Sequence, residues 1–98
     1  MTIEKKTSGS CVELKLSGWL DTVTSPELGE AVNALDDSVK ELVLDCAELE
    51  YISSAGLRVL LSAHKLMAKK GGMKVKNAGE DIMEIFEVTG FSYILDIE

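Results

Sequence analysis

The segment from Glu41 to Gly71 constrains most strongly what this chain can fold into. It begins with a short apolar run, Leu42 to Cys46, continues through a connector, Ala47 to Ile52, and then reaches a long amphipathic run, Ala55 to Lys70. A short apolar run flanked by polar residues is typical of a strand that is covered on both faces. The amphipathic run predicts a helix, which ends where two lysines suit the negative end of its dipole and glycine follows.

A pair of serines, Ser53 and Ser54, stands between the predicted strand and the predicted helix. Serine just before an amphipathic run marks a helix start, because its hydroxyl accepts a hydrogen bond from an otherwise unpaired amide of the first turn. One serine suffices for this cap. If Ser53 is the cap, Ser54 lies in the first turn with its side chain free. A capping role alone remains the alternative to a functional one.

The remainder of the chain alternates between strands and helices. Residues 1–7 and 11–16 flank a Ser-Gly-Ser turn and predict a hairpin, after which residues 17–21 leave the second strand. Ser25 is the expected cap of a helix whose first position is Pro26. A strand over 73–76 and a helix ended by Gly90 follow, and the apolar tail should pack as a short helix or a last strand. This order predicts an α/β domain with a mixed sheet, parallel inside and antiparallel at one end.

Length and charge bound the class of protein. Ninety-eight residues suffice for one core, so we expect one domain over residues 1–98. A formal charge of -7 argues against binding to nucleic acid, which is driven by cationic side chains. No apolar run approaches the length of a membrane span. The two cysteines have no metal-ligand spacing and no secretory signal precedes them, so we expect reduced thiols and a cytoplasmic protein.

Catalytic chemistry is weakly supported by the sequence. A nucleophilic serine needs a base within hydrogen-bond reach, and the only histidine, His64, lies about 15 Å of helix rise beyond Ser54. His64 also falls on the apolar stripe of its helix, which favours a place at the edge of the core. A small hydrolase using Ser53 or Ser54 therefore remains a weak alternative. We expect no metal and no cofactor, because neither a calcium loop nor a phosphate-binding glycine loop is present.

A phosphate on Ser54 would suit the start of the predicted helix. It would meet unpaired backbone amides and the positive end of the helix dipole. Arg58 lies one turn further on and could reach the same phosphate. Such a modification would leave the domain folded and change the charge of its surface, and thereby its choice of partner.

Two stretches of the sequence resemble the STAS domain family, specifically the bacterial anti-sigma-factor antagonists. Residues 42–45 with Tyr51 to Leu61 are similar to the family's signature, and Leu16 to Asp21 with Thr24 and Pro26 resembles its first loop. The resemblance runs nearly end to end. It implies a four- to five-stranded mixed sheet with about four helices chiefly on one face.

The resemblance also implies a function. The protein would be a regulator and no enzyme, and it would bind an anti-sigma factor with serine kinase activity and so release a sigma factor. We expect a monomer or weak dimer. The kinase would phosphorylate the serine that opens the central helix, which breaks the complex, and a serine phosphatase would restore it. A STAS adaptor or sensor that regulates another complex or binds a nucleotide, and an unregulated scaffold, remain as alternatives.

Aligned on Gly56-Leu57, the resemblance places the phosphoserine at Ser54, with Ser53 as the second choice. Family members regulated in this way commonly carry Asp before that serine, where this chain has Ser53, and another serine where it has Ala55. The expected partner contacts are the residues of the helix start and the first loop: Asp21, Thr24, Ser53, Ala55, Gly56 and Arg58.

Overall fold

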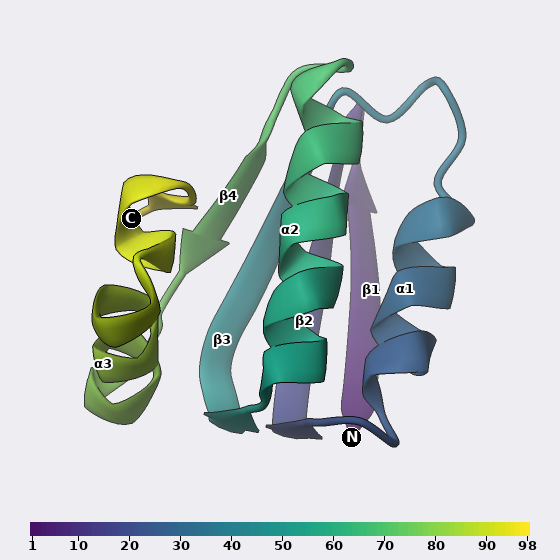
Figure 1. Ribbon diagram of the computed structural model, residues 1–98. Helices are drawn as coiled ribbons and strands as arrows, with labels where there is room; N and C mark the ends of the chain where they lie inside the picture. The colour runs from purple at the N-terminus through teal and green to yellow at the C-terminus, as the bar shows by residue number, and fades with distance from the viewer.

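Five strands form one mixed sheet, in the order β1-β2-β3-β4-β5, in a computed structural model that describes residues 1–98. β1 (Thr2–Ser8) and β2 (Cys11–Leu20) form the predicted antiparallel hairpin at one edge. β3 (Glu41–Ile52), β4 (Met73–Lys76) and β5 (Asp96–Ile97) add to β2 in parallel (Figure 1). The predicted α/β class and the mixed sheet are confirmed.

Three α-helices and one 3-10 turn join the strands, where about four helices were expected. They are α1 (Ser25–Asn33), α2 (Ser54–Ala68), α3 (Glu80–Thr89) and the turn η1 (Phe91–Tyr93). In Figure 1 α1 and α2 lie in front of the sheet and α3 lies beside β4. The apolar tail thus forms both a short helical turn and a last strand. None of the helices combines the length and the apolar character that a membrane crossing requires.

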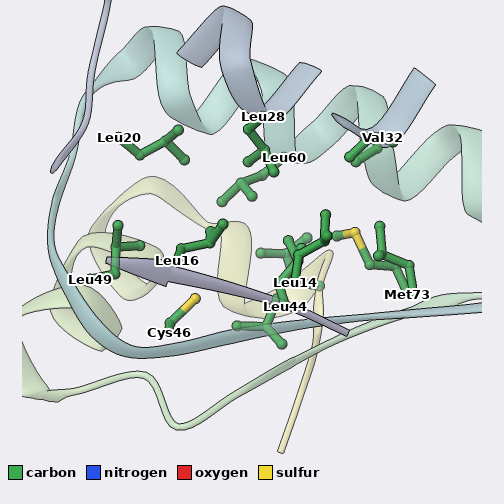
Figure 2. Close-up of a cluster of buried hydrophobic side chains, with 14 of the residues drawn as sticks. Leu14, Leu16, Leu20, Leu28, Val32, Leu44, Cys46, Leu49, Leu60 and Met73 are labelled. Carbon is green, nitrogen blue, oxygen red and sulfur yellow. The ribbon is translucent and has the colours of Figure 1, made fainter. Parts of the chain in front are cut away.

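The helices cover one face of the sheet. In β2 the side chains of Val12, Leu14 and Leu16 are buried, whereas the residues between them are only half-buried. The same alternation runs through the first half of β3, so this strand is covered on one face and not on both as predicted. Figure 2 shows part of the resulting core, in which leucines of β2 and β3 meet those of the helices. The opposite, open face is polar and carries ion pairs such as Lys76 to Glu13, 2.6 Å between Nζ and Oε1.

The predicted connector Ala47 to Ile52 is wrong, because β3 continues through it to Ile52. The strand is hard to recognise there since its buried residues, Cys46, Leu49 and Ile52, recur every third residue instead of every second. Shifts in the β2–β3 register cause this change of period, as expected where an extra residue bulges out of a ladder. β2 also runs on to Leu20, beyond the predicted end, because it stays paired with β3 as far as Ile52.

Helix α1 also begins differently from the prediction. Ser25 is its first helical residue and is buried, and Thr24 occupies the cap position without a capping side-chain hydrogen bond. The amide of Ser25 donates to the carbonyl of Asp21 at 2.8 Å. The loop before α1, and not Ser25, therefore organises this helix start.

Candidate functional site

Helices α1 and α2 begin at the same end of the sheet, where the parallel strands β2 and β3 terminate (lower end in Figure 1). The amide of Ser53 donates to the carbonyl of Leu20 at 2.9 Å, which ties the two strand ends together. The predicted site residues of the first loop and of the central helix therefore meet at one end of the molecule, although more than thirty positions of sequence separate Asp21 from Ser54.

Ser53 caps α2, as the sequence predicts. Its backbone is extended, its Oγ accepts from the amide of Gly56 at 3.3 Å, and its carbonyl accepts from the amide of Leu57 at 2.9 Å. Ser54 is the first helical residue and is exposed, and its hydroxyl makes no hydrogen bond within the chain. Of the two serines, one is engaged by the fold and the other is free at the surface.

Gly56 lets the start of α2 pack closely on the end of β2. A Cβ atom at this position would lie 2.7 Å from the carbonyl oxygen of Leu20 and 3.0 Å from Cγ2 of Ile52. Only a residue without a side chain allows this approach. Because Gly56 is buried, its role is to position Ser54, and it offers little surface to a partner.

The first turn of α2 carries no acidic residue, whereas α1 has Glu27 and α3 has Glu80 and Asp81 in theirs. Acidic side chains in a first turn compensate the positive end of the helix dipole. In α2 this end stays uncompensated. The nearest charged side chain on the helix is Arg58, which is exposed and takes part in none of the chain's ion pairs.

Asp21 and Thr24 hold the loop before α1 in one conformation. Asp21 Oδ1 accepts from the amides of Val23 and Thr24, each at 3.0 Å, and the hydroxyl of Thr24 donates to the carbonyl of Trp19 at 2.6 Å. The hydrogen bonds from Thr24 are the main cause that lowers the pKa of the Asp21 carboxyl below its ordinary value. Asp21 is therefore an ionised, half-exposed group on a fixed loop.

A groove of about 360 Å³ runs between α1 and α2 next to this site. Two of the predicted contact residues, Ala55 and Arg58, line it together with Gly29 and Val59. Small side chains on both helices leave this space open. The predicted partner contacts are thus divided between the loop, the helix start and the mouth of a groove.

No catalytic arrangement surrounds either serine. His64 is half-buried in α2, and its Nδ1 is enclosed without a hydrogen-bond partner. Burial raises the pKa of the Cys46 thiol to about 12, so this group stays protonated and is a poor nucleophile. No group of three potential His, Cys, Asp or Glu ligands comes together to hold a metal ion.

A pair of aromatic side chains, which the sequence does not predict, lies at the same end of the sheet. Trp19 and Tyr51 are partners in the β2–β3 register, with ring centroids 5.5 Å apart. Both are exposed. The two rings meet because β3 continues through the residues predicted as a connector. The only signal in the sequence is that an aromatic residue stands just before the end of each strand.

Comparison with known proteins places this geometry in a family. The family model for the STAS domain of the Mlab type matches residues 3–96, so the chain belongs to the STAS domain family. It is similar to the anti-sigma-B factor antagonist of Bacillus subtilis (strain 168), with 26% identity over 99% of this chain and 90% of the relative. Its namesake in Listeria monocytogenes is 30% identical over 89% of this chain and 78% of the relative.

A solved structure agrees with these relatives. The crystal structure of an anti-sigma factor antagonist from Mycobacterium paratuberculosis superposes with a TM-score of 0.87 and is 27% identical, over 98% of this chain and 83% of that one. The order of strands and the three helices therefore belong to the fold of this family.

Proposed function

We propose that the protein is an anti-sigma-factor antagonist switched by phosphorylation of Ser54. In its unphosphorylated form it binds an anti-sigma factor that is also a serine kinase, and so frees a sigma factor. Phosphorylation by that kinase ends the complex, and a serine phosphatase restores it. The names of the relatives and the resemblance of residues 51–61 to the family signature support the partner.

The observation that carries the proposal is the start of α2. An exposed hydroxyl, Ser54, begins a helix whose first turn carries no acidic side chain to compensate the helix dipole. A phosphoserine carries a charge of about -1.5 to -2 at neutral pH and three acceptor oxygens. Such a group suits a helix start without an acid, and Arg58 lies one turn away on the same helix.

Ser54 is a better acceptor than Ser53. The Ser53 hydroxyl accepts from the Gly56 amide and is half-buried, so its modification would remove the helix cap. Ser54 makes no such contact. Its modification changes the surface and leaves the cap in place.

The proposed contact surface surrounds Ser54. Asp21, Thr24 and Ala55 lie at the same edge of the sheet or on the first turn of α2, and Arg58 completes the surface. A phosphate at its centre would bring a dianion into contact with partner groups that were matched to a neutral hydroxyl. Misplaced charge at an interface costs several kcal/mol, which is enough to end a complex.

We also propose that the chain itself is no enzyme and acts in the cytoplasm as a monomer or weak dimer. The kinase would supply base, metal and nucleotide for the transfer, so the acceptor protein needs only an accessible hydroxyl. Neither serine has an imidazole within reach, which agrees with a passive acceptor.

Binding of three variants to the anti-sigma factor tests the proposal. Ser54→Asp should weaken binding by about tenfold or more, and Ser54→Ala should bind like the wild type but accept no phosphate. Ser8→Asp is the matched control, because it adds the same charge on an exposed residue at the end of β1. Equal binding of Ser54→Asp and Ser54→Ala would contradict the switch.

The groove between α1 and α2 favours one alternative, a STAS adaptor or sensor that binds a small molecule such as a nucleotide. Calorimetric titration with nucleotides distinguishes it. Saturable binding that Ala55→Leu abolishes, in a protein that binds no kinase, would replace the proposed function by this one.

A further inference from the structure

Trp19 and Tyr51 form an exposed aromatic pair on the open face of the sheet. Their neighbours Leu20 and Ile52 point into the core. Because successive side chains of a strand point to opposite faces, Trp19 and Tyr51 point away from the helices. They lie opposite each other in the register, and their rings are tilted by 55° with centroids 5.5 Å apart.

The pair is unusual among the side chains of this chain. The side chains around it on the open face of β2 and β3, such as Lys15, Ser17 and Glu48, are polar or charged, whereas Trp19 is 56% and Tyr51 is 44% exposed. The chain has only five aromatic residues, and two of them lie on the face of the sheet that no helix covers. Large aromatic side chains at a surface are typical of the centre of a protein interface.

Acidic residues neighbour the aromatic pair along both strands. Glu48 is bound to Ser17 at 3.0 Å and to Lys15 at 3.7 Å, so its charge is partly compensated. Glu50, next to Tyr51, is exposed and forms no ion pair, and the carboxylate of Asp21 follows the end of β2. The electron-rich faces of the two rings and the unpaired carboxylate of Glu50 together attract a cation.

We propose that Trp19 and Tyr51 are the docking point for an arginine side chain of the anti-sigma factor. A planar guanidinium stacks on aromatic rings and pairs with carboxylates, which a compact ammonium does less well. The inference rests on the proposed function for the identity of the partner. It extends the interface from Ser54, past the end of β3, to Tyr51 and Trp19 on the open face of the sheet.

This second contact does not depend on the modification. A phosphate at Ser54 changes the charge at the start of α2, whereas the aromatic pair lies on the open face of the sheet. A second copy of this chain fits the pair poorly, because each copy has a net charge of -7 and would bring its own carboxylates to the contact.

Conservative replacements separate a guanidinium site from a merely apolar one. Trp19→Leu and Tyr51→Leu keep apolar bulk but remove the ring, and each should weaken binding of the anti-sigma factor by about tenfold. Trp19→Phe and Tyr51→Phe keep a ring and should retain most of the affinity. Tyr93→Leu is the matched control, because Tyr93 is 92% exposed in η1, outside the proposed surface.

Binding of both leucine variants at wild-type affinity, while Ser54→Asp still blocks the complex, would overturn this inference and leave the proposed function standing. An equal loss in Tyr93→Leu would also overturn it. A wild-type dimer in sedimentation that Trp19→Leu dissociates would identify a second copy as the occupant and contradict the proposal.

If the wild type binds no anti-sigma factor, the proposed function fails and a peptide decides the arginine site by itself. Trp19 is the only tryptophan, so its fluorescence reports directly on the pair. A peptide that carries two arginines among otherwise uncharged residues should change this emission. The same peptide with citrulline in place of both arginines should not change it at the same concentration. Equal responses to the two peptides would contradict a cation site.

Discussion

The starts of α1 and α2 lie side by side at one edge of the sheet and are built in opposite ways. The start of α1 is closed by its own loop, where the Asp21 carboxylate accepts from two amides and Glu27 adds a second negative charge. The start of α2 has a neutral cap, Ser53, an exposed hydroxyl, Ser54, and no acid. Both ends are satisfied as structure, but only the second leaves its positive potential facing solvent.

This difference supports the proposal that the start of α2 acts as a switch and that the start of α1 does not. A phosphate at the start of α1 would meet two carboxylates, and like charges at short distance repel. A phosphate at Ser54 would supply the negative charge that is absent from the first turn of α2. The fold brings two helix starts to the same end of the sheet, and their side chains differ in the charge that they would tolerate.

The largest expected contrast is between the two helical glycines. Gly56→Ala should lower the free energy of unfolding by about 1–3 kcal/mol, because its Cβ would collide with the Leu20 carbonyl. Gly29→Ala in α1 meets nothing within 4 Å and should raise it by about 0.5–1 kcal/mol. Urea denaturation measures both, and a stabilised Gly56→Ala protein would show that the start of α2 is not tightly packed.

Removal of the cap of α2 comes next in size. Ser53→Ala should lower the free energy of unfolding by about 1 kcal/mol, because the Gly56 amide loses its acceptor. Ser53→Gly should lower it by only about 0.3 kcal/mol, since glycine is tolerated at a cap and leaves the amide open to water. Similar losses in the two variants, measured by thermal unfolding, would mean that the 3.3 Å hydrogen bond contributes nothing specific.

A permanent charge at each helix start should have opposite effects. Ser54→Asp should raise the free energy of unfolding by about 0.3–1 kcal/mol at low ionic strength, because it compensates the dipole of α2. Glu27→Gln removes the only acid of the first turn of α1 and should lower it. Added salt should shrink both effects. A Ser54→Asp protein that unfolds would refute the claim that this position welcomes negative charge.

The smallest effect is the acid sensitivity of the α1 loop. The pKa of Asp21 is lowered from its ordinary value near 3.8, so its contribution to stability is complete above pH 3.8 and disappears as the pH falls through the lowered folded value. Asp21→Asn keeps an acceptor oxygen without a charge, so its stability should fall less steeply below pH 3.8. Parallel acid profiles of the variant and the wild type, measured by urea denaturation, would contradict this.

Much of the fold could be predicted from local patterns. The hairpin, the long central helix and its Ser53 cap follow from turn residues, amphipathic spacing and a hydroxyl at a helix start, all of which act within a few residues of sequence. The end of β3 could not be predicted in this way. Its buried residues change from every second to every third position because of register shifts against β2, which is a tertiary property.

The site divides along the same line. The free hydroxyl of Ser54 could be predicted, because a cap needs only one of two serines. The role of Gly56 could not, since it depends on the distance to Leu20 in another strand. The aromatic pair could not be predicted either, because Trp19 and Tyr51 meet only through the pairing of β2 with β3.

Intact-mass and fragment analysis of the protein, purified from the cells that produce it under several growth conditions, tests the central claim most directly. We expect one phosphate, located on Ser54, whose occupancy varies with the growth condition. A phosphate on Ser53 would contradict the assignment of the acceptor. A protein that carries no phosphate under any condition would contradict the switch and reduce the two serines to a helix cap.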